Sequence, residues 1–379
     1  MPQLPDEQPA HAVDVVHETL PFDGAPPFDA RLRFLRSAAA HASLGEPPEE
    51  LETHMSWLFF VGERVLKLKK PVHFAYLDFT TLAAREHDCR EEVRLNARLA
   101  PGVYLGLIAL REDHGHLTLV DEAHLSAPGR TVDWLVAMRR LPHERSLGAL
   151  LADHAVGIAD VDALADRLVG FYRRALTLRI EPQAYVERFR EAQQLNRQVL
   201  ATAAVRWPQP ASVLDRYDAM LERWAPLLLE RARHRRIVEG HGDLRCEHVW
   251  LMPPAPLVID ALEFSAPLRQ VDPFDELAYL ALECTLDGAA WVGDRLSVRC
   301  AAALGETLPP ALLPLYTAHR ALIRARLSMA HLQDEHPRTP ERWPLQAAHY
   351  LERALAAIEL LEALGHAHSF KTARRSCIP

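Results

Sequence analysis

The residues best suited to chemistry lie in one short stretch, His241 to Phe264, which reads HGDLRCEHVWLMPPAPLVIDALEF. Asp243 stands in a polar loop near its start, and Asp260 ends the apolar run LVI near its close. A carboxylate at the end of an apolar strand is costly to bury unless a cation or hydrogen-bond donors meet it. A divalent metal ion is one such cation, so the stretch predicts a metal site at Asp260.

The same stretch predicts a hairpin. Two short apolar runs, 249–251 and 257–259, flank a turn rich in proline. Positions 248 and 260 lie at equal distances from the centre of that turn, and such positions face each other across a hairpin. We therefore expect His248 to lie across from Asp260, beside Asp243.

A second hairpin is expected near the N-terminal end of the chain. Two apolar, β-favouring runs, 57–61 and 64–69, flank a turn that contains Gly62. Side chains alternate between the two faces of a strand. Lys67 and Lys69 therefore share one face of the second strand, and the leucines beside them share the other.

The next element that could contribute to a site is a helix from about residue 81 to residue 99, capped by Thr80 or Asp78. On this helix Glu92 shares a face with two leucines, three and seven residues further on. Glu92 is therefore the carboxylate that we expect to point inward.

The remaining elements predict an α+β arrangement in two lobes, a small β-rich lobe and a larger, mostly helical lobe. Helical periodicity dominates after residue 146. We expect a flexible N-terminal arm at 1–27, an N-lobe at 28–141, a helical C-lobe at 142–365 and a C-terminal tail at 366–379. The other expected elements are a helix at 31–40, strands at 104–111, 117–120 and 131–141, and helices between 146 and 236 and at 277–286, 312–332 and 345–364.

Composition narrows the classes of function. The 379 residues carry a formal net charge of -8, which argues against a general nucleic-acid binder with a basic stripe. No apolar run approaches the roughly 20 residues of a membrane span, and the N-terminal residues lack a basic-then-apolar signal, so a cytoplasmic location is expected. The five cysteines are scattered without a CxxC pair, which favours reduced, structural thiols.

Several segments together resemble the aminoglycoside phosphotransferase-like family, a branch of the protein-kinase-like superfamily, from about residue 50 to 365. HGDLRCEH resembles its HGDxxxxN catalytic loop, VIDALEF its strand with a metal-binding Asp, and VDPFDELAYLAL the helix that follows. ETHMSWLFFVGERVLKLKKP and EEVRLNARLAP are similar to the kinase-like half of bacterial proteins that fuse this module to a P-loop ATPase. The chain has no GxxxxGK[ST] motif, so such an ATPase would be a separate partner.

The resemblance implies a two-lobed, protein-kinase-like fold and ATP-dependent phosphoryl transfer to a hydroxyl of a small molecule. Asp243 would be the catalytic base or would orient the hydroxyl, and Asp260 would hold Mg²⁺ on the nucleotide phosphates. Lys67 would contact the phosphates and pair with Glu92. Lys69 is the other candidate, but Val65, two residues before Lys67, suits the adenine-facing position better than a charged residue would.

The resemblance also places the rest of the nucleotide. Met138 would line the adenine pocket, and backbone groups at the interlobe hinge, around Arg140 and Leu141, would bind the adenine. The turn that would cover the phosphates lacks the family's glycines, and the hydroxyls of Thr53 and Ser56 are possible substitutes.

His248 departs from the family, which has a metal-binding Asn at this position. Imidazole suits Mn²⁺ or Zn²⁺ better than Mg²⁺. His248 therefore binds a second metal ion such as Mn²⁺, binds a phosphate, or orients the loop. The alternative to an active kinase is a catalytically altered, kinase-like module that binds nucleotide or a protein partner. Phosphorylation of a protein side chain is a third option.

Three further features have structural interpretations. Asp272, followed by Pro273, is expected to cap a helix, with Asp275 completing the cap, and in the family an acid here also supports the catalytic loop. The basic run 231–236 is expected to be a solvated helix end, with phosphate binding as the lesser alternative. Cys246 is expected to pack under the loop.

Overall fold

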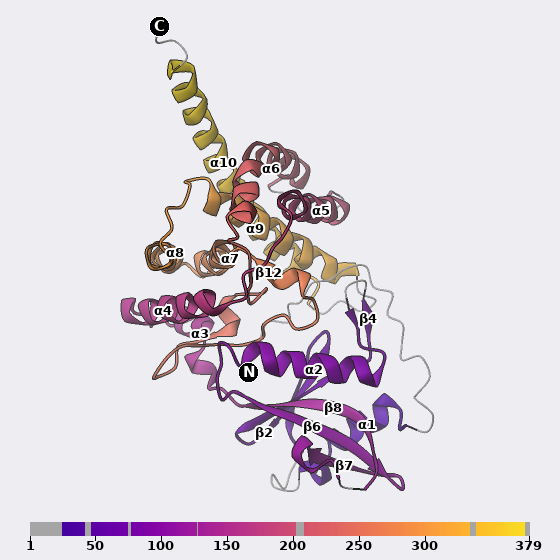
Figure 1. Ribbon diagram of the computed structural model, residues 1–379. Coiled ribbons are helices and arrows are strands. Elements are labelled where there is room, and N and C mark those ends of the chain that lie inside the picture. The colour runs from indigo at the N-terminus through magenta and orange to yellow at the C-terminus, as the bar shows by residue number, and fades with distance from the viewer. Residues whose placement is uncertain are drawn as a thin grey trace. The chain divides into compact units, whose positions relative to one another are not determined.

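The computed structural model describes residues 25–41, 47–74, 77–126, 128–201, 208–333 and 339–375 (Figure 1). The chain forms two compact units. The first comprises residues 1–146 together with 257–266, and the second comprises 147–256 together with 267–379. The segment 257–266, which carries Asp260, therefore belongs by its contacts to the first unit, although the sequence places it far along the chain.

The first unit is built on a six-stranded antiparallel sheet. The strand order is β1-β2-β3-β8-β6-β7, so the hairpin of β2 and β3 lies next to the central strand β8. The predicted hairpin and the three later strands are confirmed. The strands are β1 (Glu49–Glu52), β2 (Ser56–Val61), β3 (Arg64–Lys69), β6 (Tyr104–Asp113), β7 (His116–Asp121) and β8 (Arg130–Arg139), with a separate pair β4 (His73–Phe74) and β5 (Leu77–Asp78).

The edge strand β1 was not expected, because three of its four residues are glutamates and it follows two prolines. Its pairing with β2 satisfies the backbone, while the charged side chains stay in water. The helix expected at 31–40 is instead α1 (Phe28–Leu35) followed by a short 3-10 turn (Ala38–His41). The predicted N-terminal arm lies outside the described residues, apart from 25–27.

Helix α2 (Leu82–Asn96) occupies the predicted position, but its N-cap is Thr81 rather than Thr80 or Asp78. The hydroxyl of Thr81 accepts the N–H of Ala84 at 3.1 Å. Asp78 instead accepts the N–H of Thr80 at 2.9 Å, one turn before the helix. An N-cap side chain must reach the amide two or three residues on, and only Thr81 stands at that spacing from the first free helical amide.

The two faces of β3 have different surroundings, as alternation predicts. Leu66 and Leu68 are buried in an apolar cluster with α1 and the inner strands. Lys67 and Lys69 point to the other face, where their ammonium groups contact Glu92 on α2. The sheet therefore has an apolar core on one side and a charged, buried layer on the other.

Asp133 on β8 joins α1 and α2 to the sheet. Its carboxylate is fully buried and accepts Nη1 of Arg31 on α1 at 2.6 Å and Nε of Arg85 on α2 at 2.9 Å. A buried guanidinium is tolerated only when a carboxylate meets it. Asp133 therefore fixes where α1 and α2 cross the sheet.

The second unit is mostly helical. Helix α9 is its centre, because α5, α6, α7 and α10 all pack against it. The strands β9 (Val238–Glu239) and β12 (Gln270–Val271) pair beside the helices, and β10 (Val249–Trp250) follows the catalytic-loop motif. The helices are α3 (Leu147–Ala152), α4 (Ile158–Arg174), α5 (Pro182–Leu200), α6 (Pro210–Arg233), α7 (Pro273–Leu286), α8 (Ala290–Leu304), α9 (Leu312–Ala330) and α10 (Arg342–Arg375).

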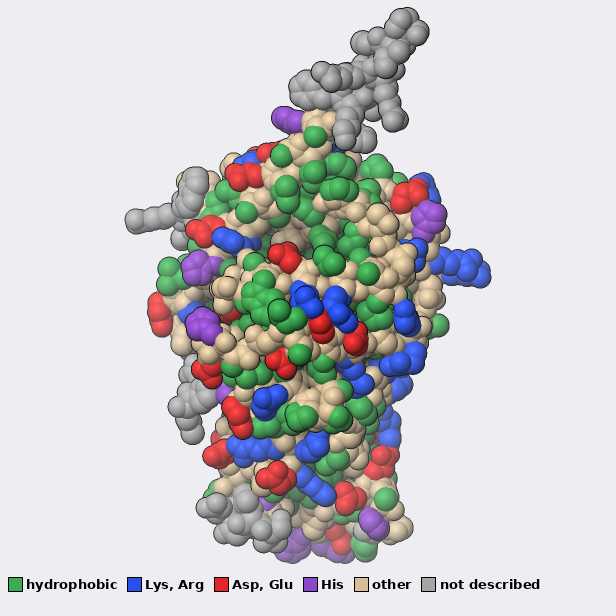
Figure 2. Space-filling model, turned by 90° about the vertical axis from the view of Figure 1, so that its left-hand side faces the viewer, with side chains coloured by type: hydrophobic (Ala, Val, Ile, Leu, Met, Phe, Trp, Pro, Cys, Tyr) green, Lys and Arg blue, Asp and Glu red, His purple; other side chains and the backbone are tan. Residues whose placement is uncertain are grey.

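Helix α7 begins as predicted: Asp272 is its N-cap, and Pro273 holds the first position. Helix α10 extends to Arg375, into the expected C-terminal tail. None of the helices in the described part of the chain is long and apolar enough to cross a membrane. Figure 2 shows basic and acidic side chains interspersed over one face of the molecule, which is typical of a solvated surface.

We predict that Asp133→Ala lowers the free energy of unfolding of the first unit by about 3–5 kcal/mol, because two guanidinium groups lose their buried carboxylate. Urea denaturation followed by the fluorescence of Trp57 and Trp134 measures this loss. The control is Glu50→Ala, which breaks a half-exposed pair with Arg36 and should cost less than about 1 kcal/mol. Equal losses in the two variants would contradict the prediction.

Candidate active site

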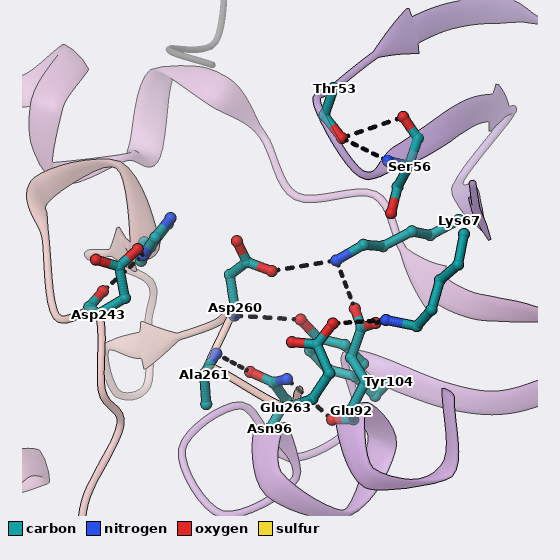
Figure 3. A network of polar contacts seen from close by, with 12 residues as sticks. Thr53, Ser56, Lys67, Glu92, Asn96, Tyr104, Asp243, Asp260, Ala261 and Glu263 are labelled. Carbon is teal, nitrogen blue, oxygen red and sulfur yellow. Dashed lines mark hydrogen bonds and ion pairs between the residues drawn. The ribbon is translucent and has the colours of Figure 1, made fainter. Parts of the chain in front are cut away.

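Lys67 lies at the centre of a polar network in the first unit (Figure 3). Its Nζ donates to Oε1 of Glu92 at 2.9 Å and to Oδ1 of Asp260 at 3.2 Å. The predicted pair of Lys67 with Glu92 is therefore present. Burial opposes a charged lysine, but Asp260 and Glu92 raise the pKa of Lys67 well above its usual value. Burial likewise opposes ionisation of Glu92, but Lys67 and Lys69 hold the pKa of Glu92 below its usual value, so the pair is ionised.

Lys69 lies in the same network, although the resemblance favours Lys67 over Lys69 for the phosphate contact. Its Nζ contacts Oε2 of Glu92 at 2.8 Å, Oδ2 of Asp88 at 2.7 Å and Oε1 of Glu263 at 2.5 Å. The two lysines thus share Glu92, one on each carboxylate oxygen. Asp88 and Glu263 were missed. Asp88 stands four residues before Glu92 on the same helix face, which was a usable signal, whereas the contact of Glu263 spans 194 residues.

Asp260 is held by its backbone as well as by Lys67. Its φ is 63°, a left-handed conformation that Asp tolerates better than most residues. Its N–H donates to the hydroxyl of Tyr104 at 3.3 Å, and the N–H of Ala261 donates to Oδ1 of Asn96 at 2.9 Å. The network therefore presents an Asp carboxylate, one-quarter exposed, beside a charged lysine.

The donor set around Asp260 fits Mg²⁺ held jointly with a nucleotide. Mg²⁺ is commonly bound by one or two carboxylates together with phosphate oxygens and waters, not by a full protein cage. Within the described ranges no group of three or more His, Cys, Asp or Glu side chains could hold a metal ion alone. Asp260 supplies the single hard oxygen ligand that such a shared site needs.

The residues expected around adenine lie at neighbouring positions of the sheet. Val65 on β3 pairs with Met138 on β8, so their side chains adjoin on one face. The N–H of Arg140, however, donates to the carbonyl of Glu63 at 2.7 Å. The carbonyl oxygen of Arg140, not its N–H, is therefore the group that fits adenine binding, and Leu141 follows it in a segment without regular secondary structure.

The turn expected to cover the phosphates is closed by its own residues. The hydroxyl of Thr53 donates to the carbonyl of Ser56 at 3.1 Å and accepts the N–H of Ser56 at 3.0 Å (Figure 3). Thr53 is thereby committed to shaping the turn. The buried Ser56 hydroxyl is the better candidate of the two for a phosphate contact.

In the second unit Asp243 lies in a loop shaped by Gly242, whose φ of 92° excludes most other residues. The N–H of Asp243 donates to Nδ1 of His241 at 3.2 Å. One carboxylate oxygen, Oδ2, lies 3.0 Å from Nη2 of Arg245, a fully buried guanidinium that also pairs with Glu247. Asp243 and Glu247 raise the pKa of Arg245 well above its usual value against the effect of burial.

His248 is bound within the same loop. Its Nδ1 lies 2.8 Å from the carbonyl oxygen of Asp243, and a carbonyl only accepts, so Nδ1 carries the hydrogen. Nε2 is then an acceptor, 3.5 Å from Nη2 of Arg245. These contacts favour loop orientation among the three interpretations of His248, and metal binding stays a prediction. Its expected position across from Asp260 also stays a prediction.

Glu276 on α7 supports the loop at 241–248, whereas the resemblance pointed to Asp272 or Asp275 for this role. Oε1 of Glu276 accepts the N–H of Gly242 at 2.5 Å, and Oε2 accepts the hydroxyl of Tyr172 at 2.9 Å. Burial raises the pKa of Glu276 to about 7, against both hydrogen bonds. Asp275 instead forms a double ion pair with Arg320 on α9.

The expectation that the run 231–236 is a solvated helix end is wrong for its first residue. Arg231 is buried and pairs with Asp272 and Glu306, because α6 ends against the start of α7. Cys246 packs under the loop as predicted, with its Sγ 3.5 Å from Sγ of Cys284. The four described cysteines are free thiols, and Cys377 lies outside the described residues.

The fold belongs to a known class. The chain resembles a choline/ethanolamine kinase family protein from Mesorhizobium loti with a TM-score of 0.50 and 16% identity, over 87% of this chain and 98% of that protein. The choline kinase LicA from Streptococcus pneumoniae gives a TM-score of 0.47 at 14% identity, over 88% and 99% of the two chains. The likeness to the Mesorhizobium loti protein shows a two-lobed, protein-kinase-like α+β fold, as expected.

Sequence relatives are more similar but carry no assigned activity. The chain is 30% identical over 332 residues to uncharacterized proteins of Mycobacterium tuberculosis and Mycobacterium bovis. The match covers 85% of this chain, and the chain spans 64% of the length of these relatives. No family model matches the sequence.

The raised pKa of Glu276 predicts a pH-dependent stability. As pH rises, the unfolded chain loses this proton near 4.5, whereas the folded chain keeps it to about 7. The unfolded state is therefore favoured progressively between these values. Glu276→Gln cannot ionise, so the stability of the variant relative to the wild type should rise by about 3 kcal/mol from pH 4.5 to pH 7.

Urea denaturation at several pH values measures this difference. The control is Glu352→Gln, at an exposed position of α10, whose stability should follow that of the wild type at every pH. A difference between Glu276→Gln and the wild type that stays constant with pH would refute a buried, protonated Glu276.

Proposed function

We propose that the protein is an ATP-dependent phosphotransferase that transfers the γ-phosphoryl group of ATP to a hydroxyl of a small molecule. The observation that carries the proposal is the ionised lysine of β3, held between the α2 carboxylate Glu92 and the carboxylate Asp260. Phosphoryl transfer needs little more than positioning and electrostatic stabilisation of the phosphates. A lysine, a helix glutamate that fixes it and an aspartate for a metal ion are suited to that task.

Each residue in the proposal has one role. Lys67 binds phosphate oxygens, and Glu92 fixes the position of Lys67. Asp260 holds Mg²⁺, for which Mn²⁺ is a possible substitute, and the ion neutralises charge on the phosphates when bound. Val65, Met138, Arg140 and Leu141 hold the adenine, and Ser56 contributes at the covering turn.

Asp243 orients the acceptor hydroxyl and takes its proton. Its Oδ2 faces Arg245, which fixes the rotamer of the side chain. A second oxygen, Oδ1, is then the group that meets the acceptor. The Mesorhizobium loti protein among the structural neighbours is named as a choline/ethanolamine kinase family protein. This favours a small hydroxyl compound over a protein side chain as the acceptor here.

A second candidate function is a kinase-like module that binds nucleotide or a protein partner without turnover. The observation in its favour is that Asp243 is already engaged by a buried guanidinium, with His248 where a metal-binding amide was expected. A cytoplasmic location and a separate P-loop ATPase partner remain predictions.

We predict that Asp243→Asn lowers ATP-dependent turnover by about 100-fold or more, because loss of a general base removes a factor of 10²–10⁴. ATP binding should change by less than about threefold, since the nucleotide contacts lie on other residues. A screen of hydroxyl metabolites for ATP consumption, followed by calorimetric titration of ATP with Mg²⁺ and with Mn²⁺, measures both quantities.

The matched control is Glu247→Gln, which removes the other carboxylate on Arg245 without touching the reacting group. It should lower turnover by less than about tenfold. Full turnover in Asp243→Asn would refute the role of Asp243. Nucleotide binding without turnover in the wild type, for every acceptor screened, would favour the binding module.

A further inference from the structure

The first unit devotes a second, deeply buried lysine to the site. Lys69 is 1% exposed, and its Nζ meets three carboxylates, those of Asp88, Glu92 and Glu263. Two of these acids belong to α2, and the third belongs to the segment 257–266 that carries Asp260. Lys69 therefore connects three parts of the chain: β3, α2 and this segment.

Lys69 does not have the means to bind a phosphate. The Nζ of Lys69 donates to Glu92 and Glu263 and lies 2.7 Å from Oδ2 of Asp88, and the side chain is 1% exposed, so three acids and burial close it to a phosphate. Lys67 contacts two carboxylates among the described residues and is 13% exposed, so it retains one donor for a phosphate oxygen. The two lysines on the same face of β3 thus differ in their capacity to bind a phosphate.

The segment 257–266 runs along one face of α2. Asp88, Glu92 and Asn96 are spaced four residues apart, which places them in one row on the helix. Asn96 at one end of this row accepts the N–H of Ala261, and at the other end Lys69 joins Asp88 and Glu92 to Glu263. Asp260 lies next to the first of these two attachments.

We propose that Lys69 and Glu263 are a positioning pair that holds the Asp260 segment on α2 and so keeps Asp260 beside Lys67 without a bound nucleotide. The inference deepens the proposed function. It rests on the proposed function only for the role of Asp260 as a metal ligand. Breaking the pair removes the attachment at Glu263, one of several that hold the segment.

Hydrogen exchange followed by mass spectrometry tests the pair without any substrate. The variant is Glu263→Gln, which leaves Lys69 its other two carboxylates. The amides of Asp260 and Ala261 are bonded to Tyr104 and Asn96, so loosening of the segment should speed their exchange by about tenfold or more. Unchanged exchange of these amides would overturn the proposal.

The matched control is Glu52→Gln, which breaks the ion pair of Lys70, the residue directly after Lys69. Exchange of Asp260 and Ala261 should be unchanged in this control. If Glu263→Gln unfolds the whole unit, the amides of β8 exchange fast as well. Glu263→Asp then replaces it, since this variant keeps the carboxyl group and withdraws it from Lys69, and it should speed exchange at 257–266 alone.

A second readout applies to the active enzyme. In Glu263→Gln the Mg²⁺ concentration for half-maximal activity should rise by about 10-fold or more, as for other residues that orient a metal ligand. The KM for ATP at saturating Mg²⁺ should change by less than about threefold. Lower activity with unchanged Mg²⁺ dependence would overturn the positioning role. Absence of turnover in the wild type would refute the proposed function, and the hydrogen-exchange result would then decide whether Lys69 and Glu263 are a positioning pair.

Discussion

The first unit depends on the burial of two ammonium groups. Lys67 and Lys69 lie on the same face of β3, and an unpaired ammonium there would be costly. Four carboxylates meet them: Asp88 and Glu92 from α2, and Asp260 and Glu263 from the segment 257–266. The helix must therefore present a polar face to the sheet, and a distant segment of the chain must return to it. The requirement that buries the lysines also gathers the residues of the proposed nucleotide site.

Several other buried charges in the molecule are also paired with opposite charges. In the first unit Asp133 is matched to the guanidiniums of Arg31 and Arg85. In the second unit Arg245 fixes one oxygen of Asp243, and Arg320 pairs with Asp275 one residue before Glu276. Pairs of this kind add little net stability compared with apolar packing, but removing one partner is costly. They define positions, which phosphoryl transfer requires more than it requires reactive groups.

Much of this arrangement could be predicted from the sequence because it depends on local periodicity. Alternation along 64–69 placed both lysines on one face, and helical spacing turned Glu92 inward. The β-rich lobe and the helical lobe followed from the change of pattern near residue 146. Glu263 and Glu276 were not legible, because each acts through a contact that spans 34 residues or more, and no local pattern encodes such a pairing.

The sequence pattern alone cannot separate Lys67 from Lys69, whereas their contacts in the structure can. Alternation gives them the same face, and the argument from Val65 ranks them only through the resemblance. What separates them physically is the number of carboxylates that each ammonium meets, two for Lys67 and three for Lys69. The Lys67 side chain is also 13% exposed, whereas that of Lys69 is 1% exposed, so a ligand can reach Lys67 and not Lys69. The less buried lysine is therefore the one suited to the nucleotide, and the more deeply buried one fixes the acids around it.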